Sequence, residues 1–442
     1  MTKRILFLSF FIINGLSAQK PYLKNHWYTI GPIEEPSPNS SASSKGIGPI
    51  EFIRSTNLQE GLLLAGSLNG GLFYTTNGGD NWINAGSDYW AYSTSTWAEF
   101  YPKDQNIWFA SSHERESNGK PGRLGLYGGI YRTKDSGVTW TEIADNNSFN
   151  GLENIAVFGF RFHPNNSKKM YVFTSSDIYF TNDCLADEVV WVAETRIKGK
   201  FYDLDFVNNT PYFSGVQHGK WNVYHESENS FEKIKGIEDL TGSIIQITLE
   251  PHENNLLILV DFRSESDKLY HYNPMTKEMV LLSSSQRVTF GAGHTFAVNP
   301  HASNEIYLGV STRLRRWNID TKKFENLGSD YHVDIEYVTF DPFDTNKIYM
   351  ASHGGVFISK NKGVSWDNKS NGIGVAEVLG MDVGVSDPNE VVIGTFHDGS
   401  MVYADWNKDG KYYWKNVNGG DALIPLINPL NSINRTNNIH TL

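Results

Sequence analysis

The stretch TKDSGVTW, residues 133–140, carries a pattern of residue types that the chain repeats at two other places. Residues 75–82 are TTNGGDNW and residues 359–366 are SKNKGVSW. All three copies have Ser or Thr, then Asp or Asn two residues later, then a Gly and a final Trp. The segments GGLFYT, GGIYRT and GGVFIS lead into them, and their alternation of side chains is typical of half-buried strands. Each copy is therefore predicted to be a hairpin turn.

Every position of the repeated turn has a local structural task. The Asp or Asn side chain accepts hydrogen bonds from backbone N–H groups two residues on, and the Gly supplies a positive φ angle. The Trp begins the return strand as a large packing anchor. The pattern therefore specifies an architecture more firmly than a function.

A second phrase also recurs, made of an apolar strand, a polar turn that often contains Pro, and another apolar strand. Its copies begin at Ser55, Tyr101, His163, Asn208, Glu250, Asn299, Asp341 and Ser386. Successive copies start roughly 40 to 60 residues apart, which is the length of one four-stranded propeller blade. We therefore predict an all-β fold with a single β-propeller of four-stranded blades over residues 19–420.

The number of inner strands sets the number of blades. Eight candidates give a count of eight blades, with seven as the alternative; they lie near Phe52, Trp97, Phe160, Leu204, Ile247, Phe296, Val338 and Met381. The N-terminal strand at residues 26–30 has no inner strand of its own. We expect it to complete the last blade and close the ring, which removes free sheet edges. Residues 421–442 are expected to form a C-terminal tail without another strand pair.

The N-terminus indicates the compartment. Residues 1–18 have a basic start, an apolar run and small residues before Gln19, as in a secretory signal peptide. No segment is long and apolar enough to predict a membrane span. Cys184 is the single cysteine, so no internal disulfide and no lipobox cysteine are predicted. We expect a monomer that is secreted or at the cell surface, and the export route and any truncation from a longer protein stay open.

The charge balance narrows the choice of partners. The chain has 38 Lys and Arg against 49 Asp and Glu, which argues against nucleic acid as a partner. A glycan or an extracellular protein is therefore the expected class of partner.

These motifs resemble those of the Asp-box, or BNR-repeat, propellers, over about residues 25–420. That superfamily includes sialidases, xyloglucanase-type glycoside hydrolases, sortilin-like domains and photosystem-assembly-factor propellers. The arrangement of WYTIGPI, GLFYTTNGGDNW and GTFHDGS is most similar to secreted propellers of Bacteroidota, often exported by the type IX route. The resemblance implies the propeller fold and says little about chemistry, because function resides in the site.

Two enzymatic groups of that superfamily have motifs that this chain lacks. Sialidases carry an Arg-Ile-Pro setting near the first strand, whereas here Arg54 is followed by Ser55 and Thr56. Xyloglucanase-type enzymes place a catalytic Asp in a Thr-Asp-x-Gly-Gly phrase, and Leu68 occupies that position here. On these residues we therefore predict neither sialidase nor xyloglucanase activity for this chain.

In a propeller the loops between the second and third strands, and between successive blades, open on the face opposite the repeated turns. The longest such loop, residues 111–129, is our first candidate for a site, against the alternative of an ordinary solvated loop. Histidines from four blades should project toward this face. The catalytic candidates are His113, His218, His353 and Arg115. The binding candidates are Tyr89, Trp90, Arg123, Trp221, Arg263, Arg313, His397 and Asp398.

These residues leave three functions open. Loop aromatics can stack on sugars and histidines can hydrogen-bond hydroxyl or carboxylate groups, which favours a glycan-binding or protein-binding module. The alternative is a carbohydrate-active enzyme, either a glycoside hydrolase or a polysaccharide lyase, that uses the His, Arg and acidic residues as acid and base. A structural or assembly role is the third.

No cofactor is predicted. The histidines show no short metal-ligand spacing, so no metal site is predicted among them. Asp405, Asn407 and Asp409 imitate the start of a calcium loop, but Asn416 stands where such a loop needs Glu. We interpret this segment as a plain hairpin turn, with structural calcium as the alternative.

Overall fold

The computed structural model describes residues 29–38, 46–113, 127–149, 155–237, 243–263, 265–286, 295–310, 313–427 and 439–441. The chain divides into two compact units, Met1–Gly31 and Pro32–Leu442. The predicted signal peptide lies outside the described residues, and the fold below is that of the second unit. Among the described residues, no helix is long and apolar enough to cross a membrane.

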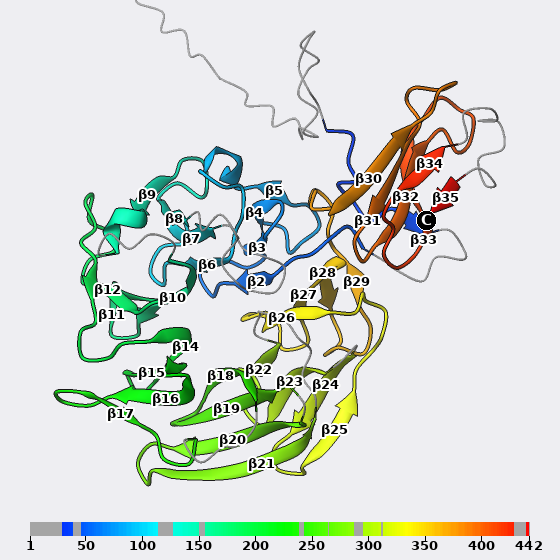
Figure 1. Ribbon diagram of the computed structural model, residues 1–442. Helices are drawn as coiled ribbons and strands as arrows, with labels where there is room; N and C mark the ends of the chain where they lie inside the picture. The colour runs from blue at the N-terminus through cyan, green and yellow to red at the C-terminus, as the bar shows by residue number, and fades with distance from the viewer. Residues whose placement is uncertain are drawn as a thin grey trace, which may run out of the picture. The chain divides into compact units, whose positions relative to one another are not determined.

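The described residues of the second unit form β-strands and two short 3-10 helices, η1 (Ser87–Tyr89) and η2 (Asn146–Ser148). Eight sheets follow one another along the chain, and we number them sheet 1 to sheet 8 (Figure 1). In each sheet, four consecutive strands pair antiparallel in chain order. The eight predicted four-stranded units are thus present, and the fold is the predicted all-β propeller.

The first four sheets have the following strands. They are β2 (Phe52–Ser55), β3 (Leu63–Ser67), β4 (Gly71–Thr75) and β5 (Ile83–Asn84) in sheet 1; β6 (Trp97–Phe100), β7 (Trp108–His113), β8 (Tyr127–Thr133) and β9 (Thr141–Ala144) in sheet 2; β10 (Val157–His163), β11 (Asn166–Thr174), β12 (Ile178–Thr181) and β13 (Val192–Ala193) in sheet 3; and β14 (Lys200–Val207), β15 (Thr210–Gln217), β16 (Lys220–Glu226) and β17 (Phe231–Lys233) in sheet 4.

The other four sheets continue in the same way. They are β18 (Ile244–His252), β19 (Asn255–Phe262), β20 (Asp267–Asn273) and β21 (Glu278–Gln286) in sheet 5; β22 (Phe296–Val298), β23 (Glu305–Val310), β24 (Arg313–Asn318) and β25 (Lys323–Asn326) in sheet 6; β26 (Ile335–Phe340), β27 (Ile348–Ser352), β28 (Gly355–Ser359) and β29 (Asp367–Asn368) in sheet 7; and β30 (Val378–Val383), β31 (Val391–Thr395), β32 (Gly399–Ala404) and β33 (Tyr413–Asn418) in sheet 8.

The repeated turn at residues 133–140 joins β8 to β9 through its own side chains. Thr133 Oγ1 donates to Asp135 Oδ1 over 2.7 Å and accepts from the Gly137 N–H over 3.0 Å. Asp135 Oδ1 also accepts from the Thr139 N–H over 2.8 Å. Gly137 has the expected positive φ, 84°. The two other copies make the corresponding bonds between β4 and β5 and between β28 and β29. All three are the predicted hairpin turns, but the Asp or Asn side chain accepts from the N–H four residues on, not two, because the Ser or Thr hydroxyl takes the Gly N–H.

The core is divided among the interfaces between neighbouring sheets. One hydrophobic cluster fills each interface from sheets 1 and 2 to sheets 6 and 7, and a further cluster joins sheet 7 to sheet 1. The first strands touch in the same order, and β26 of sheet 7 contacts β2 of sheet 1. Seven sheets therefore form a closed ring, which agrees with the alternative count, while the eighth sheet stands outside the ring.

Direct polar contacts join sheet 7 to sheet 1. The Trp82 indole N–H donates to the Lys369 carbonyl oxygen over 2.6 Å. Lys369 Nζ in turn lies 2.8 Å from Asp80 Oδ1. At the inner end, Ser55 Oγ donates to the Phe340 carbonyl oxygen over 2.8 Å. These bonds and the shared hydrophobic cluster make this interface the closing seam of the ring.

The bond from the Trp82 indole is one of several similar hydrogen bonds between neighbouring sheets. Trp140 of sheet 2 donates its indole N–H to Ala85 O in the segment after sheet 1, over 2.5 Å. Trp191, just before the last strand of sheet 3, donates to Ile143 O of sheet 2 over 2.8 Å. The tryptophan before the fourth strand of these sheets therefore fastens that sheet to the one before it.

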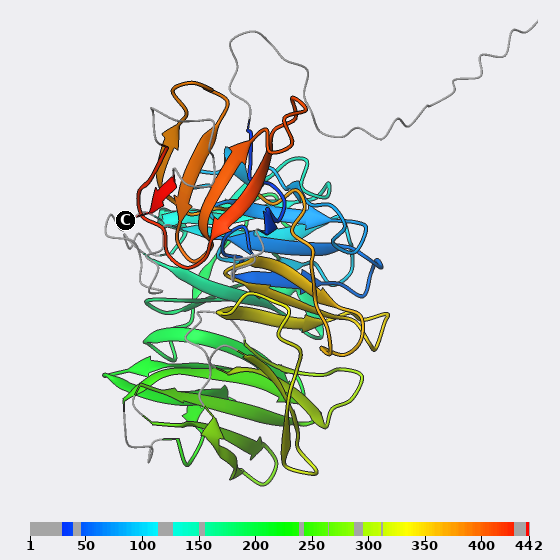
Figure 2. The same ribbon diagram turned by 90° about the vertical axis from the view of Figure 1, so that its right-hand side faces the viewer.

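Sheet 8 differs from the other seven. Its buried apolar residues form two small clusters of their own, and in both views it lies beside sheets 1 and 7 (Figures 1 and 2). Its first strand, β30, is largely exposed, and Met381 keeps 62 % of its surface in solvent. The prediction of an inner strand near Met381 is therefore wrong, because seven sheets already close the ring.

The N-terminal segment enters the fold differently from the prediction. Residues 26–28 lie outside the described residues, and residues 29 and 30 are not in a strand. Instead β1 (Ser37–Pro38) pairs in parallel with β33 as a fifth strand of sheet 8. The segment therefore extends sheet 8, and the ring closes between sheets 7 and 1.

The C-terminal segment was expected to lack a strand pair, and the structure corrects this. β34 (Pro425–Ile427) and β35 (Ile439–Thr441) form an antiparallel two-stranded sheet. β34 contacts β30 and β31, and the Ile427 N–H donates to Asp382 Oδ2 over 2.8 Å. The segment therefore adds to sheet 8 on the side of its exposed first strand.

The closing seam leads to a stability prediction. Trp82→Phe removes the indole donor and leaves the Lys369 carbonyl oxygen without it, which should lower the free energy of unfolding by about 1–3 kcal/mol. The midpoint of urea unfolding, followed by circular dichroism, measures this. Trp406→Phe is the control, because the Trp406 indole bonds Tyr413 O within sheet 8. An unfolding midpoint of Trp82→Phe equal to that of the parent would contradict a ring closed by Trp82.

Candidate functional site

The predicted loop residues lie where the blade pattern put them, although not all of their side chains are described. His218 is exposed in the turn between β15 and β16, and Arg263 and Arg313 are exposed at one end of β19 and β24. His113 ends β7, but its side chain lies outside the described residues. Arg115, Arg123 and the rest of residues 114–126 lie outside them as well.

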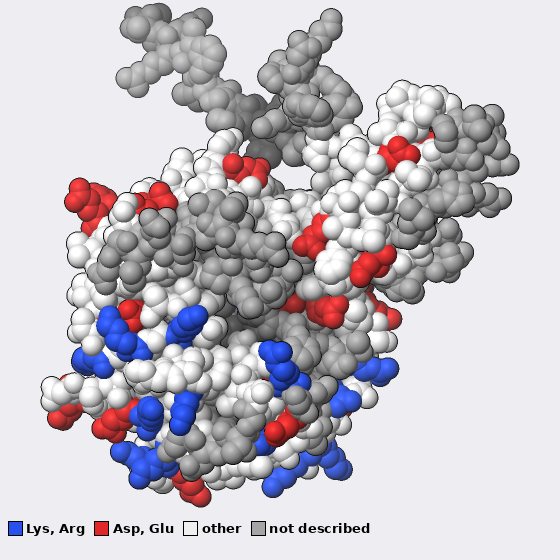
Figure 3. All heavy atoms as spheres, viewed as in Figure 1, with Lys and Arg blue, Asp and Glu red and all other residues white. Residues whose placement is uncertain are grey.

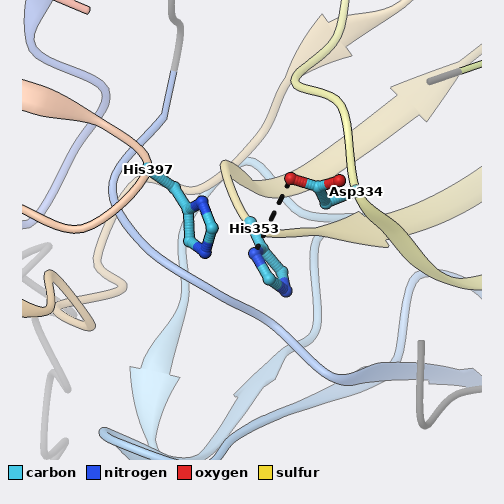
Figure 4. A group of neighbouring side chains, drawn as sticks. All are labelled: Asp334, His353 and His397. Atoms are coloured by element: carbon cyan, nitrogen blue, oxygen red, sulfur yellow. Dashed lines mark ion pairs between the residues drawn. The ribbon is translucent and has the colours of Figure 1, made fainter. Parts of the chain in front are cut away.

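Three of the predicted residues come together where sheet 8 meets sheet 7. His353 follows β27, and His397 and Asp398 form the turn between β31 and β32. The rings of His353 and His397 lie 4.4 Å apart between centroids, and Asp334, just before β26, approaches from the other side of His353 (Figure 4). Its Oδ2 is 4.0 Å from His353 Nδ1. We call these four residues, with Glu336 and His332, the junction cluster.

Carboxylates surround the histidines of the junction cluster. His353 Nε2 donates to Glu336 Oε1 over 3.1 Å. Burial lowers the pKa of His353, but the hydrogen bond and charge of Glu336, with help from Asp334, outweigh burial and raise the pKa to about 9. Burial and the neighbouring His353 lower the pKa of His397. On this face, Asp and Glu side chains gather where sheet 8 meets sheets 1 and 7 (Figure 3).

Asp398 is the most buried acid of the cluster. Its side chain is fully buried, and burial raises its pKa to about 8, against the opposing charge of His353. His332 Nε2 lies 3.8 Å from Asp398 Oδ1. A side chain at Gly46 would come within 2.1 Å of that same oxygen. The chain before sheet 1 therefore passes directly over Asp398 and needs glycine to do so.

A second place with unusual electrostatics is a cavity of about 440 Å³ at the centre of the ring, which we call the axial cavity. Its wall comes from the first strands of sheets 1, 2, 3, 5, 6 and 7 and from the turns that follow several of them. The lining includes Ser55, Thr56, Asn57, Glu99, Phe100, Pro102, Arg161, Glu250, Ala297, Val298, Pro300, Tyr337, Phe340 and Pro342.

The turns that line the cavity identify the end of the ring to which it belongs. In sheet 2, Ser136 of the repeated turn bonds Asn106, which lies in the turn after the first strand. In sheet 7, Lys362 N–H donates to Asn346 O in the same way. The axial cavity therefore lies toward the end of the repeated turns, opposite to the loop face on which the sequence placed the site.

The charged groups of the axial cavity form a chain of contacts. Arg161 Nη1 donates to Glu99 Oε1 over 3.0 Å, and its Nε lies 3.9 Å from Asp205 Oδ2. Arg54 Nε is 3.4 Å from the same Glu99 oxygen, and its guanidinium lies 4.3 Å from the Tyr337 ring centroid. The cavity thus offers hydrogen-bonding groups of both charges beside one aromatic ring.

Burial strongly raises the pKa values of two acidic side chains in this region. Burial, together with the charge of Asp205, raises the pKa of Glu250 to about 8, although its Oε1 accepts the Val298 N–H over 3.0 Å. Burial raises the pKa of Asp203 to about 7, against the opposing charge of Arg161. Glu250 is therefore a neutral acid in a cavity whose neighbouring Glu99 is paired with arginine.

The predicted sugar-stacking aromatics have different surroundings. Tyr89 is 92 % exposed in η1, as a contact residue must be. Trp90 is only 7 % exposed and stacks on Tyr131 at 4.7 Å, so the prediction that it contacts a ligand is wrong. Trp221 is half-buried, packs on Tyr202 and donates its indole N–H to Ile244 O. Core packing therefore accounts for Trp90, and largely for Trp221.

The segment that imitates a calcium loop forms the turn between β32 and β33. Asp405 Oδ1 accepts the Asp409 N–H over 3.0 Å, and Oδ2 accepts the Gly410 N–H over 2.9 Å. The Tyr413 hydroxyl donates to Asn407 Oδ1 over 3.4 Å. These side chains are engaged in holding the turn.

Several residues of both places were absent from the sequence-based candidates. They are Asp334, Glu336 and His332 at the junction, and Glu99, Arg161, Glu250 and Tyr337 in the cavity. Glu99 and Arg161 share one feature of the sequence, since each is a charged residue in a largely apolar first strand, as in WAEF and FGFRFH. A polar residue at this position in successive repeats was the available indication of an axial site.

Comparison with known proteins supports the fold. No family model and no curated protein matches the chain. The solved structures that match include the GH74 enzyme of Niastella koreensis, with a TM-score of 0.61, 14 % identity and coverage of 90 % of this chain and 69 % of that one. The common fold is the β-propeller.

Two other matches belong to different kinds of protein. The extracellular domain of the two-component system protein BT4673 from B. thetaiotaomicron has a TM-score of 0.52 and 13 % identity, over 84 % of this chain and 45 % of that one. YCF48 bound to D1 peptide has a TM-score of 0.50 and 13 % identity, over 74 % of this chain and 99 % of that one. The likeness therefore extends to proteins with unlike roles, and the site must decide the function.

The raised pKa of Glu250 predicts that the free energy of unfolding depends on pH. Because its pKa of about 8 exceeds the ordinary 4.5, the stability that neutral Glu250 contributes is complete below about pH 4.5 and is lost as the pH rises through about 8. Glu250→Gln keeps a neutral side chain at every pH. From pH 5.5 to pH 9 the parent should lose about 3 kcal/mol relative to this variant in urea unfolding.

The control for this measurement is Glu278→Gln, since Glu278 is exposed on β21. The control should follow the parent across the whole pH range. Parallel curves for the parent and Glu250→Gln would show that Glu250 is ionised at neutral pH.

Proposed function

We propose that this protein is an exported propeller that binds a carbohydrate-class ligand, with the axial cavity as its binding site. The observation that carries the proposal is the lining of that cavity. Carboxylates and the guanidinium of Arg161 face a space of about 440 Å³ beside the Tyr337 ring. Sugars are bound in such places by dense hydrogen bonding together with an aromatic face, and the volume is that of a small-ligand site.

Other observations support this proposal without deciding it. The N-terminal residues resemble a secretory signal peptide, and two of the solved structures of like fold are a GH74 enzyme and an extracellular domain. The proposal places the ligand at the end opposite to the predicted loop face, because the described cavity lies there. A protein partner on the loop face remains the alternative if no sugar binds.

A substitution at the rim of the cavity tests the binding site. Asn57 lines the cavity and is exposed, so Asn57→Trp adds bulk without disturbing a buried group. A glycan array and a soluble-polysaccharide panel identify the ligand for residues 19–442. We then expect at least a tenfold loss of affinity in Asn57→Trp, because the indole occupies the opening.

Thr345→Trp is the matched control, since Thr345 is exposed in the corresponding turn of sheet 7 and is absent from the cavity wall. It should bind as the parent does. Equal affinity of Asn57→Trp and the parent would exclude the axial cavity. Binding to no glycan at all would favour a protein partner.

Glycoside hydrolysis is a second candidate, and one specific observation favours it. Enzymes of this class need one protonated and one ionised carboxyl group, and environments that push two pKa values apart mark such a pair. Glu250 is held neutral by burial, while Glu99 contacts both Arg54 and Arg161. The axial cavity therefore contains a neutral carboxyl group and a second carboxyl group beside two arginines.

The same glycan panel separates an enzyme from a binder. If the protein hydrolyses glycosidic bonds, Glu250→Gln should reduce the release of reducing ends at least a hundredfold while it keeps affinity, because the amide cannot donate the proton. Glu278→Gln should leave the rate unchanged. Binding without any release of reducing ends or unsaturated products by the parent protein would reject the enzymatic candidate.

A further inference from the structure

We propose that Asp334, His353 and His397 form a binding site for one divalent transition-metal ion of the zinc class, at the place where sheet 8 meets the ring. This inference is independent of the proposed carbohydrate site. Asp334 precedes β26, His353 follows β27, and His397 lies in the turn between β31 and β32. The three ligands therefore come from sheets 7 and 8.

The geometry is that of a cluster that can close on an ion. One ligand atom from each residue lies within 4.8 Å of the others. In Figure 4 the carboxylate of Asp334 and the ring of His397 flank His353. Bonds of about 2.1 Å in a tetrahedral arrangement place ligand atoms roughly 3.4 Å apart. Modest side-chain rotation at the His397 turn supplies this closure.

The surroundings of His353 match those of a metal-bound imidazole. Histidine ligands usually donate their second ring N–H to a carboxylate, which fixes the ring and its tautomer. His353 Nε2 donates to Glu336 Oε1 over 3.1 Å, and Nδ1 faces Asp334. His397 has a carboxylate neighbour too, since its Nδ1 lies 3.8 Å from Asp421 Oδ1.

Unsatisfied polar atoms converge on the same place. Within the described residues, His353 Nδ1, Glu336 Oε2 and both carboxylate oxygens of Asp398 are buried without a hydrogen bond. Buried polar atoms are normally bonded, so a group of them next to one another needs a cause. A bound cation supplies a partner for His353 Nδ1 and a positive charge beside Glu336.

The ligand types select the kind of ion. Two imidazoles and one carboxylate suit Zn²⁺ and the neighbouring transition metals Co²⁺, Ni²⁺, Mn²⁺ and Fe²⁺. Calcium and magnesium prefer oxygen ligands throughout. Three protein ligands leave a coordination position for water or for another group.

A bound ion would also have a mechanical consequence. Sheet 8 lies outside the closed ring, and within the described part of the chain its buried apolar side chains form two small clusters of their own. Ligands on both sides would fasten sheet 8 to sheet 7, and the ion would stabilise the folded chain in proportion to its occupancy.

Metal binding to the full chain tests the proposal. Protein freed of metal with a chelator is titrated with ZnCl₂ by calorimetry, and with CoCl₂ while the visible absorption of Co²⁺ is recorded. We expect one ion per chain, a visible Co²⁺ band and a higher melting temperature with zinc. His397→Gln and Asp334→Asn should each lower the affinity for zinc at least tenfold and abolish the rise in melting temperature with zinc.

His218→Gln is the matched control, because His218 occupies the corresponding turn of sheet 4 and is exposed. It should bind zinc as the parent does. Far-ultraviolet circular dichroism establishes that each variant is folded before titration. Absence of zinc binding by the parent, or parental affinity in both ligand variants, would overturn the proposal and leave the carbohydrate site untouched.

Discussion

The hydrogen bond from the Trp82 indole to the Lys369 carbonyl oxygen, with the apolar cluster around it, is the contact on which the rest of the structure depends. It joins the first and seventh sheets and so closes the ring before the eighth sheet is reached. The first strands must then face one another around a common axis, which creates the axial cavity. Sheet 8 is left to attach from outside, which creates the junction cluster.

Both candidate places follow from that closure, and each contains acids that are buried for a different reason. In the axial cavity, Glu250 lies on a first strand whose inward positions have lost water to the surrounding sheets. At the junction, Asp398 is covered because the chain before sheet 1 crosses over it at Gly46. Buried charge is expensive unless it serves a purpose or has a partner. Ligand binding is the purpose that we assign to both.

The sequence predicted those features that local chemistry determines. The repeated turns and the four-stranded units depend on hydrogen bonds and packing within a few residues, so Thr133, Asp135 and Gly137 were sufficient to place them. Ring closure depends on which distant sheets meet. The segment around Met381 has the same pattern as an inner strand, and nothing local shows that Trp82 bonds sheet 7 instead of sheet 8.

The candidate site was predicted in part for the same reason. The blade pattern placed His353, His397 and Asp398 on one face, and they meet there. Asp334 and Glu336 were missed because they meet His353 only when β26 pairs with β27, and no spacing in the sequence marks that pairing as a site. The buried state of Trp90 depends on Tyr131 of the next sheet, which the loop position did not reveal.

The most direct test of the closing seam is zero-length carbodiimide cross-linking of the native protein, followed by mass spectrometry of its peptides. Lys369 Nζ lies 2.8 Å from Asp80 Oδ1, so an amide bond should form between these two side chains. A peptide pair that joins Asp80 to Lys369 is the predicted result. Its absence, with Asp80 joined instead to Lys408, Lys411 or Lys415 of the sheet 8 region, would contradict a ring closed by sheets 1 and 7.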